Sequence, residues 1–251
     1  MNGLIHSIET MGTVDGPGLR LVVFTQGCPM RCLYCHNPDT WTIGTGKETT
    51  VSEIMEIYDR NKSFYKNGGI TVTGGEPMVQ MDFLIELFEE CDRRGIHTCL
   101  DTSGIIFHPD DPEMVAKTER LMKVTKLVML DIKHIDPVKH KELTSQPNDG
   151  ILAFAEFLSE KGVPVWIRHV VVPGYTDDPV YLYKLGYFIG GLKNLQALDV
   201  LPYHTMGEPK YEKLGIPYRL EGVPAMDASG ALKCKEEIIK GLKDRRLDDE
   251  K

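Results

Sequence analysis

Two hydrophobic periods alternate along this chain, and the alternation restricts the possible folds more than any other feature. Six short runs rich in β-branched residues predict buried strands, at residues 20–25, 70–73, 96–100, 126–130, 164–172 and 197–201. Between them, apolar residues recur at helical spacing, as in residues 51–58, 84–91, 151–158 and 185–192. Strands joined by helix-length connections run parallel, because each crossover returns the chain to the same end of the sheet. We therefore expect an α/β fold.

Capping signals at the helix starts and ends support these predicted helices. Thr50 and Glu53 have the spacing of a capping box, Asp111 precedes Pro112 as an N-cap, and Gly95 is a C-terminal stop signal. A last helix is predicted at residues 229–242. Six βα units are too few for a closed eight-stranded barrel, which leaves a partial, open barrel or a doubly wound sheet. We expect one domain over residues 1–251, with an N-terminal extension at 1–19, six βα units at 20–203 and a C-terminal loop and helix at 204–251.

Charge and apolar run length exclude several classes of protein. The 251 residues carry 37 acidic and 29 basic side chains, a net charge of −8. This acidic balance argues against a protein whose main role is to bind the nucleic-acid backbone. No run approaches the ~18 apolar residues of a membrane span, and residues 1–10 lack the apolar segment of a signal peptide. Six cysteines are too few for a disulfide scaffold of this length. We expect a cytoplasmic protein in a reducing compartment, without nucleic-acid or membrane partners.

Candidate catalytic and ligand-binding residues follow each predicted strand. The carboxyl ends of parallel strands share one rim, where ligand sites form, so one rim is expected to carry the active site. In chain order the groups are Cys28, Cys32 and Cys35; Gly74-Gly75-Glu76-Pro77; Asp101-Thr102-Ser103-Gly104; Asp131-Ile132-Lys133; Pro173-Gly174; and Pro202-Tyr203-His204.

The three clustered cysteines admit several metal or redox sites. A structural zinc needs a fourth ligand, yet no second cysteine pair exists and His36 is directly adjacent to Cys35. Covalent haem at residues 32–36 or a redox pair of Cys32 and Cys35 leaves Cys28 unexplained. An iron–sulfur cluster held by three thiolates would leave one iron open to a small molecule. The scattered Cys91, Cys99 and Cys234 are expected to pack in the core.

Two motifs carry a resemblance to a known family. The spacing Cys28-x3-Cys32-x-Tyr34-Cys35, followed later by Gly74-Gly75-Glu76-Pro77, resembles the radical S-adenosylmethionine enzymes. The resemblance implies a partial, open (β/α)6 TIM-like barrel of the radical SAM type. It also implies one 4Fe–4S cluster with an open iron, which binds S-adenosylmethionine and reduces it to a 5′-deoxyadenosyl radical.

Further segments narrow this resemblance. Residues 12–20, 26–28, 36–37, 127–133, 166–168 and 201–204 look like the activating enzymes of glycyl radical enzymes, of the type that serves pyruvate formate-lyase. Residues 36–73 contain no cysteine, which disfavours the relatives that carry extra clusters there. The resemblance implies removal of an α-hydrogen from a glycine of pyruvate formate-lyase or a related partner. Reduced flavodoxin or ferredoxin would supply the electron, and we expect a monomer.

The resemblance also assigns roles to individual residues. Cys28, Cys32 and Cys35 would hold the cluster, and Asp15 would contact the partner's glycine loop. The residues expected to bind the cosubstrate are Tyr34, Cys35, His36, Gly74, Gly75, Glu76, Asp101, Asp131, Ile132, Lys133 and His204. The carboxylate of Glu76 suits a cationic amine.

Other interpretations stay open at the level of sequence. Asp15 and Asp101 also fit turns, and Lys133 fits a solvated helix start. Five further histidines fit ordinary loops, namely His6, His97, His108, His134 and His140. The chain could activate another glycyl radical enzyme or act on a small molecule. A zinc-stabilised module or an electron carrier would leave the other rim motifs without a role.

Overall fold

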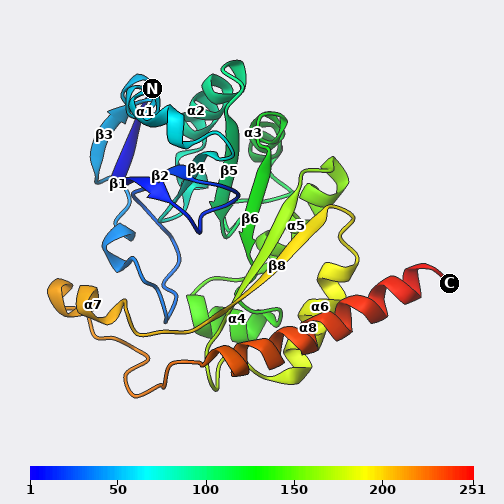
Figure 1. The fold of residues 1–251 in the computed structure, drawn as a ribbon. Helices are drawn as coiled ribbons and strands as arrows, with labels where there is room; N and C mark the ends of the chain where they lie inside the picture. The colour runs from blue at the N-terminus through cyan, green and yellow to red at the C-terminus, as the bar shows by residue number, and fades with distance from the viewer. The chain divides into compact units, whose positions relative to one another are not determined.

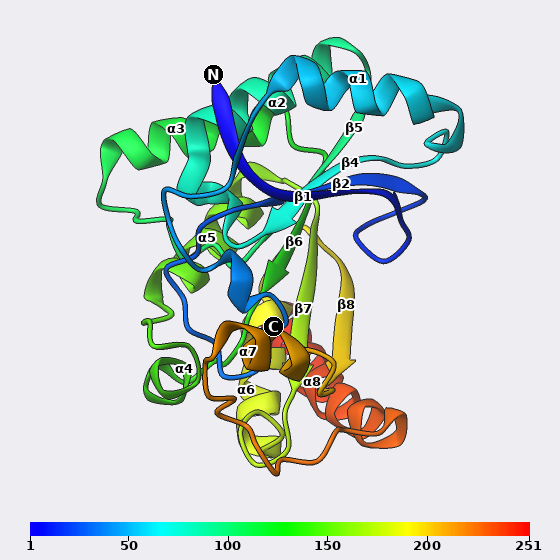
Figure 2. The ribbon, with the colours of Figure 1, turned by 90° about the vertical axis from the view of Figure 1, so that its left-hand side faces the viewer.

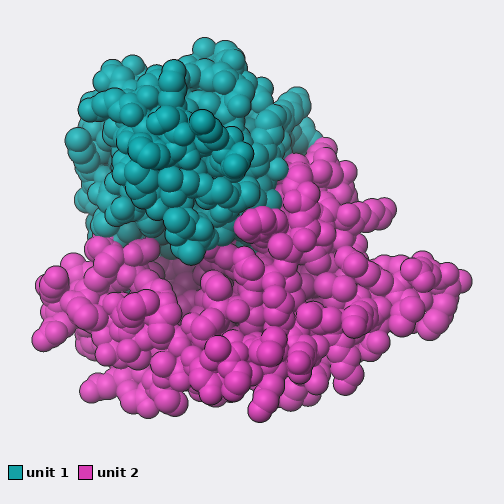
Figure 3. All heavy atoms as spheres, viewed as in Figure 1, with its two compact units in different colours: residues 1–29, 40–130 teal, residues 30–39, 131–251 magenta.

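The expected alternation of strands and helices runs through residues 1–251, all of which the computed structural model describes. The chain forms two compact units, shown in different colours in Figure 3. Unit 1 comprises residues 1–29 and 40–130, and unit 2 comprises residues 30–39 and 131–251. The cysteine segment is therefore divided, with Cys28 in unit 1 and both Cys32 and Cys35 in unit 2.

Unit 1 combines a largely parallel set of strands with a layer of helices. Its strands lie in the order β3-β1-β2-β4-β5-β6, in which β2, β4, β5 and β6 are parallel and β1 is antiparallel to β2 and β3. The bounds are β1 Asn2–Gly12, β2 Arg20–Thr25, β3 Lys47–Thr50, β4 Gly69–Gly74, β5 His97–Thr102 and β6 Leu127–Asp131, whose last residue begins unit 2. The helices α1 Val51–Asn61, α2 Met81–Arg93 and α3 Pro112–Lys123 lie in one layer along these strands (Figures 1 and 2).

Local signals account for the helix ends of unit 1. The Thr50 and Glu53 capping box is present at α1, and the Asp111 side chain accepts from the backbone N–H groups of Glu113 and Met114 at α3. Gly95 follows α2 with a φ of 67°, a left-handed conformation that favours glycine. The apolar face of α2, including Cys91, is buried. These expectations from the sequence are confirmed.

Unit 2 pairs two parallel strands, β7 Val165–Val171 and β8 Leu195–Pro202. Its helices are α4 Pro137–Thr144, α5 Asp149–Lys161, α6 Pro179–Gly190, α7 Glu208–Leu214 and α8 Ala228–Asp249. Figure 1 shows α8, in red, running beside α6. A Cβ added at Gly186 would lie 1.9 Å from the Ile238 carbonyl oxygen, and one at Gly241 would lie 2.1 Å from that of Tyr183. The two helices approach this closely because glycine stands at both positions.

The six predicted strands are present as β2, β4, β5, β6, β7 and β8, displaced by at most a few residues. Since β3 pairs only with β1 and β8 only with β7, the strands do not close into a barrel, as expected. Residues 2–12, which lie within the expected N-terminal extension, form β1. The sequence reasoning also missed β3, α4, α7 and three 3-10 helices at Pro38–Thr40, Lys62–Phe64 and Pro77–Gln80. None of the helices has the length and apolar character that crossing a membrane requires.

Buried polar side chains correct one expectation. His6 belongs to β1, His97 to β5 and His140 to α4, so the prediction of ordinary loop histidines was wrong for these three. His134 does lie in a loop, but it is 2% exposed, and His140 is 0% exposed. Cys91, Cys99 and Cys234 are all buried, as predicted.

Candidate functional site

In unit 1, the glycine motif is bound to the segment that leads into Cys28. The backbone N–H of Gly75 donates to the Thr25 carbonyl at 2.9 Å, and that of Glu76 donates to the Gly27 carbonyl at 2.8 Å. A Cβ on Gly75 would lie 2.3 Å from the Gly27 oxygen, so a larger residue would separate the two segments. The loops that follow β2 and β4 are thus held together by backbone bonds.

Glu76 fastens this glycine turn to the loop after β5. Its carboxylate, 1% exposed, accepts four hydrogen bonds. One oxygen accepts from the Thr102 hydroxyl at 2.5 Å and the Met78 N–H at 3.1 Å. The other accepts from the Ser103 N–H at 2.9 Å and its hydroxyl at 2.6 Å. Burial raises the pKa of Glu76, and these bonds oppose that rise. A carboxylate has about four acceptor positions, so all are in use.

Asp101, at the end of β5, is the second buried carboxylate of this group. It is 8% exposed and accepts a 2.8 Å hydrogen bond from the Thr73 hydroxyl of β4. Asp15 lies before β2, and its carbonyl accepts from the Thr71 hydroxyl at 2.6 Å. Unit 1 therefore brings Cys28, the glycine turn and Asp101 to the carboxyl ends of its strands.

In unit 2, Asp131 lies between two cations. Lys133 Nζ is 2.9 Å from one carboxylate oxygen, and Arg168 Nε is 3.1 Å from the other. Burial opposes ionisation of Asp131, but Arg168 and Lys133 outweigh it and lower the pKa of Asp131 to about 2. Asp131 is therefore ionised between two cations, Lys133 and Arg168.

Arg168 was not among the residues predicted for the site. It lies on β7, where exposure alternates between buried and intermediate residues, and its side chain is 16% exposed. The signal in the sequence that could have identified Arg168 was a charged residue inside the predicted strand at residues 164–172. The Ile132 side chain is fully buried, and the Ile132 backbone N–H donates to the Arg168 carbonyl at 3.1 Å.

The cysteine loop of unit 2 packs beside these charges. Lys133 Nζ lies 5.6 Å from the centre of the Tyr34 ring, and Tyr34 and Cys32 are both buried. Burial raises the pKa of the Cys32 thiol to about 12. The Tyr34 hydroxyl is buried and has no hydrogen-bond partner in the structure.

His36 and His204 stack with ring centres 4.1 Å apart, and His36 Nε2 donates to the His204 carbonyl at 3.3 Å. His204 Nδ1 is buried without a partner. Lys210 of α7 donates to Asn37 at 2.8 Å and pairs with Asp39 at 3.1 Å. The segment after β8 is thereby fastened to the segment after Cys35.

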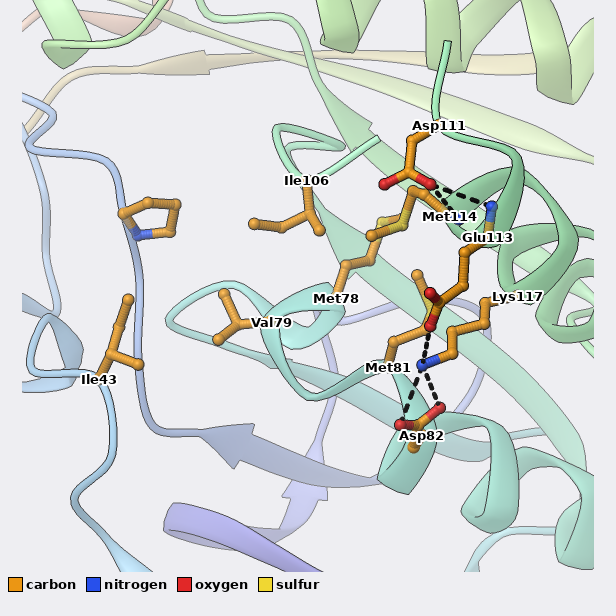
Figure 4. A pocket seen from close by; sticks show the side chains of 11 residues that line it. Ile43, Met78, Val79, Met81, Asp82, Ile106, Asp111, Glu113, Met114 and Lys117 are labelled. Carbon is orange, nitrogen blue, oxygen red and sulfur yellow. Dashed lines mark hydrogen bonds and ion pairs between the residues drawn. The ribbon is translucent and has the colours of Figure 1, made fainter. Parts of the chain in front are cut away.

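A pocket of about 440 Å³ in unit 1 has none of the predicted site residues in its lining, although Pro29, which follows Cys28, and Met78, which bonds Glu76, contribute to it (Figure 4). Methionine, isoleucine and valine side chains line it, and Lys117 at its border pairs with Asp82 at 3.0 Å and Glu113 at 3.3 Å. Figure 4 shows Lys117 directed between these two carboxylates. One cation therefore pairs with two carboxylates at this pocket.

Comparison with protein families decides the membership of the chain. Residues 22–185 match the pattern of the Radical SAM superfamily. The chain belongs to this superfamily. Among radical SAM proteins, it is 52% identical over 225 residues to the pyruvate formate-lyase-activating enzyme of Listeria monocytogenes, covering 89% of this chain and 90% of the relative. The enzyme of the same name from Streptococcus mutans is 54% identical over 226 residues, covering 89% and 86%.

These identities place the radical SAM chain in the family of pyruvate formate-lyase-activating enzymes, and it is therefore an enzyme. Solved structures agree on the fold. Streptococcus suis SuiB bound to precursor peptide SuiA has a TM-score of 0.68 at 18% identity, covering 91% of this chain and 47% of SuiB. A domain of the activating enzyme from Bacteroides vulgatus has a TM-score of 0.55 at 23% identity, covering 70% and 95%. The expected family and open radical SAM fold are confirmed.

Proposed function

We propose that this chain activates pyruvate formate-lyase by converting one of its glycines to a glycyl radical. Cys28, Cys32 and Cys35 would hold a 4Fe–4S cluster, which when bound supplies the electron that cleaves S-adenosylmethionine to methionine and a 5′-deoxyadenosyl radical. Transfer of one α-hydrogen from the glycine then yields 5′-deoxyadenosine and the glycyl radical.

The observation that carries this proposal is the backbone bond from Glu76 to Gly27, the residue before Cys28. It supports the assignment of both motifs to one site, because it ties the glycine turn to the chain entering the first cysteine. The four bonds on the Glu76 carboxylate favour a supporting role for that side chain. The turn would then meet the ammonium group of the cosubstrate with its backbone carbonyls.

The residues of unit 2 fit the polar ends of S-adenosylmethionine. Lys133 and Arg168 are both cations, and a cation suits the methionine carboxylate. The Tyr34 hydroxyl and His204 Nδ1 are buried polar atoms without partners, and such atoms ordinarily have one. A bound adenosyl group would supply hydrogen-bonding atoms beside them. His36 and Ile132 belong to the same two segments as Tyr34 and Lys133 and would lie beside this group.

Several finer features belong to the proposal. We propose that both units form one radical SAM domain and that the partners are pyruvate formate-lyase and an electron donor of the flavodoxin or ferredoxin class. Thiolate ligands require a reducing compartment, which favours the cytoplasm. The monomeric state stays a prediction.

Electron paramagnetic resonance tests the proposal. Protein reconstituted anaerobically with iron and sulfide is mixed with reductant, S-adenosylmethionine and pyruvate formate-lyase. We expect a glycyl radical signal with the unchanged chain and with Cys234→Ala, which removes a buried core thiol, but none with Cys28→Ala. Intact clusters that yield no radical on the partner, or 5′-deoxyadenosine formed only with a small metabolite, would contradict it.

A further inference from the structure

The last turn of α4 is bound to the cysteine loop within unit 2. The backbone N–H of Arg31 donates to the Thr144 carbonyl at 2.8 Å, and that of Leu33 donates to the Leu143 carbonyl at 2.9 Å. Both carbonyls belong to the C-terminal turn of the helix, where carbonyl groups have no partner within the helix itself. The backbone on both sides of Cys32 is therefore fastened to the end of α4.

A strained residue follows this helix. Ser145 has a φ of 66° and is the only non-glycine residue of the chain with a positive φ. Its backbone N–H donates to the Lys141 carbonyl at 2.8 Å, as in a left-handed helix cap. A side chain makes this conformation costly, and such strain persists only where the surrounding contacts impose it. The end of α4 is therefore held in one shape by its neighbours.

Two buried side chains impose that shape. The Thr144 hydroxyl donates to the His140 carbonyl at 2.8 Å and accepts from the Gln146 N–H at 3.2 Å. The His140 ring donates from Nδ1 to the Gln146 carbonyl at 2.8 Å. Thr144 and His140 are both 0% exposed, so bulk water does not compete for these bonds. The bonds fix the direction in which the last carbonyls of α4 point.

This arrangement bears on the charge of the proposed cluster. A 4Fe–4S cluster becomes more negative when it takes up an electron, and N–H groups that donate to its sulfur atoms favour that reduced state. The N–H groups of Arg31 and Leu33 flank Cys32, but the carbonyls of α4 engage them. The C-terminus of a helix also carries a partial negative charge, which disfavours an added electron nearby. Both effects lower the reduction potential of the cluster.

We propose that His140 and Thr144 are positioning residues, which hold the N–H groups of Arg31 and Leu33 away from the cluster sulfurs and keep the reduction potential low. This inference rests on the proposed function, because cleavage of a sulfonium needs a strong reductant. Both residues act through the backbone of the α4 turn and not as ligands to iron.

The variants Thr144→Val and Thr144→Ser form a matched pair, because valine keeps the shape without the hydroxyl and serine keeps the hydroxyl. In the full chain without a cluster, we expect the Arg31 and Leu33 amides to exchange hydrogen about tenfold faster in Thr144→Val, as for the loss of one hydrogen bond. In the reconstituted protein, a redox titration followed by electron paramagnetic resonance measures the reduction potential. We expect Thr144→Val to shift the equilibrium about tenfold toward the reduced cluster, a rise of about 59 mV for one electron. Thr144→Ser should match the unchanged protein in both measurements.

Two further variants separate positioning from general stability. His140→Leu removes the bond to the Gln146 carbonyl and should reproduce both effects, so the test does not depend on one variant folding. Gly186→Ala disturbs the contact between α6 and α8 in the same unit and should leave the potential unchanged.

Three results would overturn the inference: faster amide exchange with an unchanged potential, unchanged exchange in both Thr144→Val and His140→Leu, or an equal rise of the potential in Gly186→Ala. Failure of the proposed function alone would look different. The unchanged chain would then form no glycyl radical, while Thr144→Val would still raise the potential of the cluster.

Discussion

Ser103 donates two hydrogen bonds to one oxygen of the Glu76 carboxylate, through its backbone N–H at 2.9 Å and its hydroxyl at 2.6 Å. Glu76 follows β4 and Ser103 follows β5, so the pair joins the loops after two neighbouring parallel strands. The same carboxylate belongs to the turn whose backbone bonds the segment entering Cys28. Three loops of the proposed site are therefore coupled through one buried side chain.

Replacing this carboxylate should destabilise unit 1. In Glu76→Gln, the amide would present N–H donors to groups that are themselves donors, leaving buried polar atoms without partners. We expect the free energy of unfolding to fall by about 2–4 kcal/mol, measured by urea denaturation. Glu113→Gln, which changes a carboxylate whose side chain is 80% exposed, is the control and should shift stability by less than about 0.5 kcal/mol. Equal stability of the two variants would contradict this role.

Removing Arg168 should weaken binding of the cosubstrate. Arg168→Met leaves Asp131 paired with Lys133, so the group loses one of its two cations. We expect the affinity for S-adenosylmethionine to fall by about tenfold or more, measured by calorimetric titration of the reconstituted protein. Arg246→Met, on the exposed face of α8, should bind as the unchanged protein does. An unchanged affinity for Arg168→Met would exclude Arg168 from the binding site.

Buried histidines should make the fold sensitive to mild acid. Burial lowers the pKa of both His134 and His140 to about 4, below the value of 6.5 expected without burial. Below about pH 6.5 the unfolded chain binds protons that the folded protein does not. The free energy of unfolding should therefore decrease as the pH is lowered, by at most about 1.4 kcal/mol per pH unit for each histidine. The decrease should end as the pH approaches the pKa of each histidine in the folded protein. Urea unfolding at several pH values between about 7 and 5 measures the slope.

A histidine substitution checks the source of this slope. His140→Gln should flatten it, because the variant lacks one of the groups that titrate only on unfolding. His6→Gln, at an exposed position of β1, should leave the slope unchanged. The assignment fails if both variants keep the same pH dependence.

The contact between α6 and α8 depends on glycine. In Gly186→Ala, the added methyl would lie 1.9 Å from the Ile238 carbonyl oxygen, so the helices must separate. We expect a loss of at least about 2 kcal/mol of stability and a lower Tm in calorimetry. Lys243→Ala, on the exposed side of α8, should leave Tm nearly unchanged. A Gly186→Ala protein with the original Tm would show that this packing is easily rearranged.

The sequence by itself determined six of the strands, most of the helices, the capping residues of α1 and α3, and the family. These features depend on spacing along the chain. A helical stripe repeats every three or four residues, a capping box needs two residues three apart, and the cysteine motif lies within residues 28–35. Short-range patterns of this kind can be read without knowing which distant segments meet.

Only the tertiary structure decided the partners of individual side chains. The bonds between Arg20 and Thr71 and between Glu76 and Ser103 join residues 51 and 27 positions apart. The antiparallel pairing of β1, the burial of His134 and the place of Arg168 beside Asp131 likewise depend on segments that are distant in sequence. A polar residue looks the same in sequence whether it faces water or a buried partner, because strand pairing and packing set its surroundings.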